Sequence, residues 1–367
     1  MTPLRAVVLG VGADIWPLHH SALEAIGAEV AAVYDRDPDA TRAAATAIGC
    51  RTATGLEDLL AETAELGVVL TPQGLHAEHA IACLEAGLHV LVEKPLAITA
   101  SEADDMLAAA ARCDRLLAVA LQQRTREEVR EARRMLAEGA LGELQRIDLL
   151  ATWPRRSDYF DAAPWRAAPA TSGGGLLLNQ VQHELDLLCH LCGPPVRVTA
   201  RMRSAVHPVA AEDTAAALLE WPSGALGSLH VSSAEADELQ RIEITGTGGR
   251  LRMGYGSLEW WRTTPDYREH AALTGDPFGP PAVERMPPAL GGGGGGHIDI
   301  YRNLAGAIAG RDPLVAPAAS AASAVELANA LIQSALESRS VSLPLARDSY
   351  ARLLTRAAGT AEPAELA

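Results

Sequence analysis

The chain has 367 residues, of which 48% are hydrophobic and 21% charged, values typical of a globular protein long enough for two domains. Its formal net charge of −15 argues against a nucleic-acid or anionic-membrane partner, because both bind clustered Lys and Arg. No apolar run approaches the ~20 residues of a membrane span, and no secretory signal is visible at the N-terminus, so a cytoplasmic location is expected.

The first third of the chain alternates between two hydrophobic periods. Short runs rich in Val and Leu are separated by helical stretches, several of which end in Gly, the usual helix stop. Continuous apolar strands that alternate with helices predict a doubly wound parallel sheet covered on both faces. The predicted strands are residues 5–10, 29–35, 66–72, 88–95 and 116–122.

A glycine turn follows the first predicted strand. In "GVGADI", Gly10 and Gly12 allow a tight turn and a close approach of the backbone to a pyrophosphate, although Ile15 replaces the third glycine of the dinucleotide fingerprint. Asp35 ends the second strand, where a carboxylate accepts the ribose hydroxyls. We expect cofactor contacts from Gly10, Gly12, Ala13, Asp14, Ile15 and Asp35. The alternatives are a bare glycine turn and a purely turn-forming Asp35.

The fourth predicted strand ends in "LVEKPLAIT". Lys94 precedes Pro95, whose ring disfavours a helical conformation in the preceding residue. An extended Lys94 at the carboxyl end of a parallel strand lies where ligands bind in open α/β sheets. Lys94 is either a reactive group or a solvated lysine.

From Glu143 onward the pattern changes to runs with one polar face, which predict antiparallel strands joined by turns. Helices are expected at residues 179–191, 298–309 and 319–338. The glycine run Gly291–Gly296 predicts a mobile surface loop, with a substrate lid as the alternative.

The stretch "SGGGLLLNQVQHELDLL" combines glycines with polar residues at helical spacing. Asn179, His183 and Asp186 fall at i, i+4 and i+7 of the predicted helix and so share one face. This pattern predicts a helix that lines a cleft; buried polar groups pairing with one another are the alternative.

The five cysteines are too few and too scattered for a disulfide framework. Cys189 and Cys192 form a C-x-x-C, but no second Cys or His pair at ligand spacing accompanies them. No metal site is predicted.

Several of these motifs together resemble the Gfo/Idh/MocA oxidoreductase family. They are "GVGADI", "YDRD", "TPQGLHAEHAIACLEAGLHVLVEKPLAITASEAD" and "GGGLLLNQVQHELDLLCHLCGPP". The resemblance covers nearly the whole chain, and the EKP tripeptide with a downstream N-Q-x-x-H is its most specific part. The chain departs from the family in a longer first loop, "WPLHH", and in Asn179, where many members have Asp.

The resemblance implies an α/β protein with an N-terminal Rossmann domain at residues 1–122 and a C-terminal α/β domain at residues 123–367, which contains a large, mostly antiparallel sheet. It implies NAD(P)-dependent hydride transfer to or from a secondary hydroxyl of a sugar, sugar acid or cyclitol, with NAD preferred because of Asp35 and NADP as the alternative. Lys94 and His183 are the implied catalytic pair, and the Lys94–Pro95 bond is often cis in the family. Further implied cofactor contacts are Arg36, Thr71, Pro72, His76, Glu93 and Lys94. A homodimer or homotetramer through the open face of the sheet is implied as well.

The substrate is less defined by the sequence. Arginines and aromatics cluster in "TWPRRSDYFDAAPWR", where they could fork onto a carboxylate or phosphate and stack on a sugar. The predicted substrate contacts are Arg156, Trp165, Arg166, Asn179, Lys94 and His183. The alternative is a surface loop whose arginines pair with Asp158 and Asp161. Two other functions stay open: an NAD-retaining enzyme that uses transient oxidation for hydrolysis or epimerisation, and a non-catalytic ligand sensor.

Overall fold

The computed structural model describes residues 3–161, 172–209 and 211–360. The chain divides into two compact units, each with its own sheet. Unit 1 comprises Met1–Thr125 and Gly294–Val325, and unit 2 comprises Arg126–Gly293 and Glu326–Ala367. In the described part of the chain, no helix combines the length and apolar character needed to cross a membrane.

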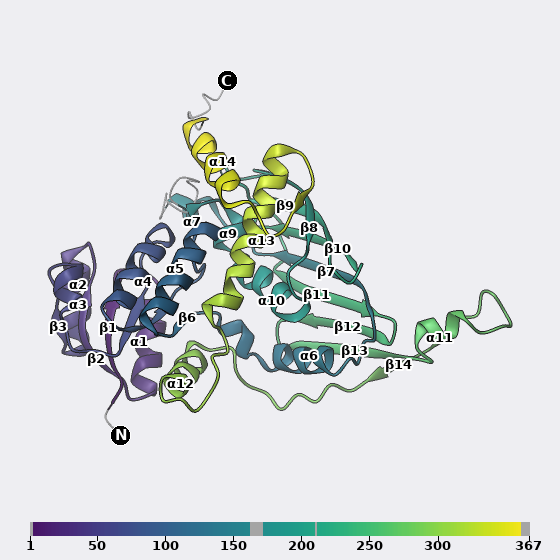
Figure 1. Cartoon of the computed structure of the whole chain (residues 1–367), viewed down its shortest axis with the longest axis horizontal. Coiled ribbons are helices and arrows are strands. Elements are labelled where there is room, and N and C mark those ends of the chain that lie inside the picture. The colour runs from purple at the N-terminus through teal and green to yellow at the C-terminus, as the bar shows by residue number, and fades with distance from the viewer. Residues whose placement is uncertain (1–2, 162–171, 210, 361–367) are drawn as a thin grey trace. The chain divides into compact units, whose positions relative to one another are not determined.

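Unit 1 is built on a six-stranded parallel sheet (Figure 1). The strand order is β3-β2-β1-β4-β5-β6, which is the Rossmann order, so the predicted doubly wound sheet is confirmed. The two-residue strand β3 was not expected. The strands are β1 (Arg5–Leu9), β2 (Glu29–Tyr34), β3 (Arg51–Thr52), β4 (Leu66–Val69), β5 (His89–Val92) and β6 (Leu117–Val119).

Helices cover this sheet, and their ends follow local sequence signals. Asp37 accepts a hydrogen bond from the Asp39 amide at the start of α2, and Thr99 with Glu102 forms a capping box on α5. Gly49 ends α2 in the left-handed conformation that favours glycine. The helices are α1 (Trp16–Ala25), α2 (Pro38–Ile48), α3 (Leu56–Leu60), α4 (His76–Glu85) and α5 (Ala100–Cys113), with the 3₁₀ turns η1 (Gln73–Leu75) and η2 (Gln122–Thr125).

A segment from the C-terminal part of the chain also belongs to unit 1. Helix α12 (His297–Ile308) packs on α1, and its Ile300, Tyr301 and Leu304 are buried in the same core as strands β1, β4 and β5. The second domain expected at residues 123–367 includes this segment. Its apolar side chains are instead buried in the core of unit 1.

Unit 2 is built on a nine-stranded sheet in the order β14-β13-β12-β11-β7-β10-β9-β8-β15. All pairs are antiparallel except β7 with β10, which confirms the predicted large, mostly antiparallel sheet. The strands are β7 (Leu144–Thr152), β8 (Arg197–Arg203), β9 (Thr214–Glu220), β10 (Leu226–Ser232), β11 (Leu239–Gly246), β12 (Gly249–Gly254), β13 (Ser257–Thr264), β14 (Ala282–Met286) and β15 (Val341–Ser342).

The two faces of this sheet differ. Helices α6 and α10 pack against one face, where side chains such as Ile242, Ile244 and Leu251 are fully buried. On the other face, Leu218 and Leu226 are 66% and 62% exposed. The helices of this unit are α6 (Glu127–Ala137), α7 (Ser157–Asp161), α9 (Leu176–Asn179), α10 (Gln182–Cys192), α11 (Tyr267–Ala271) and α14 (Arg347–Thr360), while α13 (Ala318–Glu337) runs from unit 1 into unit 2.

Candidate functional site

The predicted cofactor residues of unit 1 follow the carboxyl ends of four neighbouring parallel strands. The glycine turn follows β1, Asp35 follows β2, Thr71 follows β4 and Lys94 follows β5, and these strands are adjacent in the order β2-β1-β4-β5. Parallel strands end on the same edge of a sheet, so all four segments lie at one edge, where ligands of doubly wound sheets bind.

The glycines of the first turn are required by close contacts. Gly10 has a φ of +90°, and a Cβ atom there would lie 2.6 Å from the backbone of Leu70 and Thr71. The amide of Gly12 donates to Asp35 Oδ2 at 2.8 Å, and a Cβ atom at Gly12 would lie 3.0 Å from the same oxygen. Both glycines are therefore required by the packing of this turn against the end of β4 and against Asp35.

Ala13, Asp14 and Ile15 complete the turn, and Trp16 begins α1. The amides of Trp16 and Leu18 donate to the carbonyls of Ala13 and Ile15 at 2.9 and 3.1 Å, and Pro17 between them has no N–H. Arg36, next to Asp35, is exposed. The glycine turn after β1 and the Asp35 carboxylate after β2 are the features that fit a dinucleotide at this edge.

The loop after β4 is tied to the EKP segment by His76. Its Nδ1 lies 2.7 Å from the carbonyl oxygen of Pro95, and its Nε2 lies 2.8 Å from that of Thr71. His76 is 1% exposed, and burial lowers its pKa. Both ring nitrogens lie within hydrogen-bond distance of protein carbonyls, so His76 links the loop after β4 to the EKP segment. At the same sheet edge, the Thr71 side chain is partly exposed and the Pro72 side chain is exposed.

Glu93 and Lys94 lie directly after β5. The Lys94–Pro95 bond is cis, as expected. The Lys94 amide donates to Glu93 Oε2 at 2.9 Å, and Glu93 Oε1 lies 2.9 Å from His19 Nε2. Burial raises the pKa of the Glu93 carboxyl, but His19, His297 and the Lys94 charge outweigh it and hold that pKa well below its usual range.

The residues that surround Glu93 were not predicted from the sequence. His19 is fully buried on α1, and His297 Nε2 lies 3.7 Å from Glu93 Oε1, an ion-pair distance rather than a hydrogen bond. The His19 Nδ1 atom lies 2.8 Å from the Tyr301 hydroxyl. The available signals were the unusual "WPLHH" and the histidine that opens α12.

His19, Glu93 and His297 are also the kinds of side chain that hold metal ions, and their ligand atoms lie within 4.8 Å of one another. The 2.9 Å contact between His19 and Glu93 has the length of an ordinary hydrogen bond. Hydrogen bonding therefore accounts for this pair without a further ligand. Cys189 and Cys192 lie on α10, and burial raises the pKa of Cys192 to about 12, as expected for a packed thiol.

In unit 2, the helix predicted at residues 179–191 is in fact two helices. Asn179 ends α9, and α10 begins at Gln182. The Val181 amide reaches back to the Leu176 carbonyl, and the Gln182 side chain donates to the Leu177 carbonyl at 2.9 Å. The prediction that Asn179, His183 and Asp186 share one helix face is therefore wrong, because Asn179 lies on a different helix from the other two. All three of these side chains are buried.

One buried carboxyl group holds the start of this region. Glu212 accepts hydrogen bonds from the amides of Gly175 and Leu177 at 2.9 and 3.0 Å. A Cβ atom at Gly175 would lie 2.4 Å from the Glu212 carbonyl oxygen. The expected close approach at the glycines is therefore present, and it is made against residue 212.

Helix α10 is also held through Glu184, the neighbour of His183. Gln240 donates to Glu184 Oε1 at 2.6 Å, and the Arg126 guanidinium donates to Gln240 Oε1 at 2.7 Å. Arg126 also forms an ion pair with Glu128 at 2.5 Å. All four residues are buried. This network connects α10, which carries His183, to β11 and to the start of α6.

The arginine and aromatic cluster is only partly described. Arg156 pairs with Asp158 at 3.4 Å, and its side chain is 89% exposed, which favours the surface-loop alternative for this residue. Trp165 and Arg166 lie outside the described residues. In the Gly291–Gly296 run, the Gly291 and Gly292 amides donate to Glu127.

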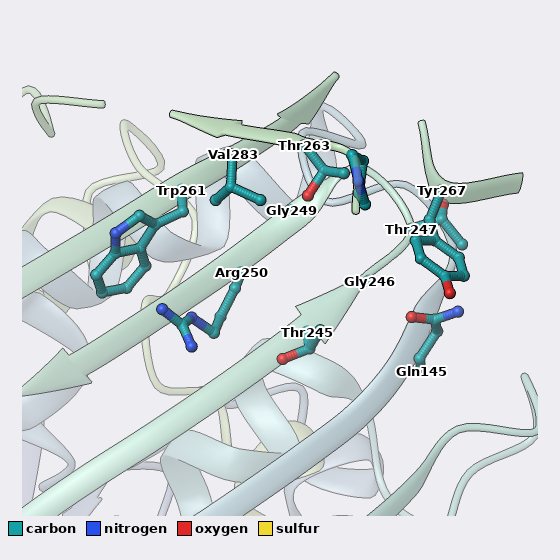
Figure 2. Close-up of a pocket in the computed structure, with 11 residues that line it drawn as sticks. Gln145, Thr245, Gly246, Thr247, Gly249, Arg250, Trp261, Thr263, Tyr267 and Val283 are labelled. Carbon is teal, nitrogen blue, oxygen red and sulfur yellow. The ribbon is translucent and has the colours of Figure 1, made fainter. Parts of the chain in front are cut away.

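A pocket of about 430 Å³ lies on the open face of the unit 2 sheet (Figure 2). Arg250 and Trp261 line it from neighbouring strands, with the guanidinium carbon 4.2 Å from the Trp261 ring centroid. The pocket contains none of the predicted site residues.

Comparisons with known proteins agree with this geometry. Residues 4–121 match the family model described as "Oxidoreductase family, NAD-binding Rossmann fold", and residues 129–252 match the GFO/IDH/MocA C-terminal domain. The chain is 32% identical over 280 residues to a candidate UDP-kanosamine synthase oxidoreductase subunit of Amycolatopsis mediterranei, covering 69% of this chain and 76% of that one.

Two solved structures are similar over almost their whole length. One is the WlbA dehydrogenase from Chromobacterium violaceum in complex with NADH and UDP-GlcNAcA, with 31% identity, a TM-score of 0.82, and coverage of 94% of this chain and 97% of that one. The other is WlbA from Bordetella pertussis, with 27% identity, a TM-score of 0.80, and coverage of 94% and 99%. With its NAD-binding Rossmann sheet and its C-terminal domain both matched, the chain belongs to the Gfo/Idh/MocA family of oxidoreductases.

Proposed function

We propose that this oxidoreductase transfers a hydride between NAD and a secondary hydroxyl of a sugar or nucleotide sugar. The carrying observation is the sheet edge of unit 1, where the Gly12–Asp35 contact and Lys94 follow neighbouring strands. The two WlbA structures, which hold NADH and a UDP-sugar acid, support a sugar substrate. Simple sugars, sugar acids and cyclitols are the other members of the proposed class.

We assign proton transfer to His183 and charge stabilisation to Lys94. An imidazole suits a general base because its ordinary pKa lies near working pH. A lysine ammonium can donate to the reacting oxygen as alkoxide charge develops. Asn179 cannot take up a proton, so its proposed role is to hold the substrate through its amide. When bound, NAD supplies the hydride acceptor. In the alternative scheme, Lys94 is the base and His183 only positions the substrate.

Single substitutions separate the two schemes. His183→Ala should lower kcat by roughly 10²–10⁴, the usual contribution of a general base, and Lys94→Met should also be severely impaired. NAD binding, measured by the quenching of protein fluorescence, should survive both changes. A His183→Ala enzyme with normal kcat and only a raised KM would move the base to Lys94. Measuring NADH formation at 340 nm with UDP-sugars, free sugars, sugar acids and inositols would identify the substrate class. Substrate turnover without net formation of NADH would indicate the alternative enzyme, which retains NAD for hydrolysis or epimerisation.

NAD should be preferred over NADP. Asp35 Oδ2 accepts a hydrogen bond from the Gly12 amide. This contact holds the carboxylate at the position where it would repel the 2′-phosphate of NADP. Asp35→Ser should lower the ratio of kcat/KM for NAD to kcat/KM for NADP by at least ~10-fold, the worth of one charged hydrogen bond. Asp105→Ser, the same change at an exposed position of α5, is the matched control and should leave this ratio unchanged. Equal kcat/KM values for NAD and NADP in the unsubstituted enzyme would contradict the role of Asp35.

The same proposal includes a homodimer or homotetramer through the open face of the unit 2 sheet. The exposed Leu218 and Leu226 support it, because apolar patches on a sheet mark contacts between proteins. Light scattering at micromolar concentration tests it, and a monomer would refute it. The proposed location is the cytoplasm, in keeping with five cysteines that are all free thiols.

A further inference from the structure

A chain of buried polar groups reaches the backbone of Lys94 within unit 1. Tyr301 on α12 is 1% exposed, and His19 on α1 is fully buried. The Tyr301 hydroxyl lies 2.8 Å from His19 Nδ1, and His19 Nε2 lies 2.9 Å from Glu93 Oε1. Glu93 Oε2 accepts the Lys94 amide at 2.9 Å. Three segments that are far apart in sequence thus meet at one carboxylate.

The directions of these hydrogen bonds are mutually consistent. Burial, and then the Glu93 charge, raise the pKa of Tyr301 well above its usual value, so its hydroxyl keeps a proton to donate. A neutral His19 that accepts from Tyr301 at Nδ1 carries its proton on Nε2 and can donate it to Glu93. The ionised carboxylate then accepts from His19 and from the Lys94 amide. One tautomer of His19 therefore satisfies every member of the chain.

Glu93 is surrounded by groups that favour its charged form. His19 and His297 approach Oε1, and Lys94 is its neighbour in sequence. Tyr301 and His76 also lie within electrostatic range of its charge. Among these, His76 contacts the Pro95 carbonyl at 2.7 Å, so the backbone is held on both sides of Lys94.

We infer that Tyr301, His19 and Glu93 form a hydrogen-bonded relay that fixes the backbone of Lys94 and keeps an ionised carboxylate beside it during hydride transfer. His19 and Tyr301 are then positioning residues, and Glu93 acts through Lys94 rather than on the cofactor. This inference rests on the proposed role of Lys94 in the reaction.

The test compares His19→Leu, which removes the donor, with His19→Gln, whose amide can still donate to Glu93. His19→Leu should lower kcat by roughly 10- to 100-fold, as expected for the loss of a hydrogen bond to a charged group, with little change in the Kd for NAD. The acid limb of kcat against pH should move to higher pH, because burial then dominates and raises the pKa of Glu93. His19→Gln should restore both values, and Tyr301→Phe should show a smaller shift in the same direction.

A readout without catalysis separates this inference from the proposed function. With its pKa held low, Glu93 contributes stability that is present above its unfolded pKa and lost on acidification. The Tm deficit of His19→Leu should therefore be larger at about pH 7 than at about pH 4. If this holds while Lys94→Met keeps full kcat, the relay is supported and the role of Lys94 is wrong. An unmoved acid limb with a pH-independent Tm deficit, or a His19→Gln enzyme as impaired as His19→Leu, would overturn the relay.

Discussion

Two carboxyl groups, the partly buried Glu93 in unit 1 and the buried Glu212 in unit 2, hold backbone close to a proposed active-site residue. Their hydrogen-bond partners differ. Glu93 in unit 1 takes a hydrogen bond from the His19 side chain and one from the Lys94 amide. Glu212 in unit 2 accepts from the amides of Gly175 and Leu177, just ahead of Asn179. Both carboxyl groups are therefore hydrogen-bonded, Glu93 by one side chain and one amide, and Glu212 by amides.

The consequences for ionisation are opposite. Burial raises the pKa of both carboxyls, yet that of Glu93 ends well below its usual range and that of Glu212 ends above it. Glu93 has imidazoles and an ammonium nearby, whereas Glu212 has a second acid, Asp213, as its neighbour. The sign of the shift thus follows the charged neighbours rather than the degree of burial.

The largest loss of stability is expected at Gly175, where the contact with Glu212 leaves no space for a side chain. Gly175→Ala places a Cβ atom 2.4 Å from the Glu212 carbonyl oxygen and 2.7 Å from Ala211 Cβ, so the backbone must move. Overpacking of this kind costs about 1–3 kcal/mol or more, and we expect a large fall in Tm by calorimetry. Gly279→Ala is the matched control, since its nearest atom would be 3.4 Å away. Equal Tm values for the two variants would show that the Gly175 contact is relaxed at little cost.

An intermediate effect is expected at Asp213, which burial alone would make harder to ionise. The amides of Val206, His207 and Ala205 outweigh burial and lower its pKa to about 2. A lowered pKa means stability that is present above the unfolded value and lost as pH falls toward about 2. Asp213→Asn should cost about 1–3 kcal/mol near neutral pH. The difference in Tm between Asp213→Asn and the unsubstituted protein should become smaller below about pH 4. A difference that does not change with pH would show that the charge of Asp213 does not contribute to stability.

The smallest effect, and the sharpest contrast with Glu93, is expected for Glu212→Gln. A raised pKa means that the protonated form favours folding, so this contribution is complete at low pH and is lost as pH rises through the folded-state pKa. The Tm of Glu212→Gln relative to the unsubstituted protein should therefore increase from acid to neutral pH. At Glu93, the equivalent Glu93→Gln change should become relatively more destabilising over the same interval. The same trend in both variants would contradict the opposite shifts.

The sequence alone determined the parts that depend on local patterns. Val-rich strands alternating with Gly-terminated helices indicated the parallel sheet, since each period is set by neighbouring residues. Gly10, Gly12, Asp35 and Lys94 could be placed at one sheet edge, because the carboxyl ends of parallel strands coincide. The break between α9 and α10 was not predicted, because it depends on the Gln182 side chain turning back to the Leu177 carbonyl.

Only the tertiary structure decided what surrounds those residues. His19, Glu93 and Tyr301 are separated by 74 and 208 positions in the sequence, and their contacts follow from α12 packing on α1. Glu212 likewise meets Gly175 across 37 positions. Periodicity shows which side of an element is buried, but not which distant element covers it. The charge state of an enclosed carboxyl group depends on the charged groups of that covering element. The tertiary structure therefore decides it, and the sequence alone does not.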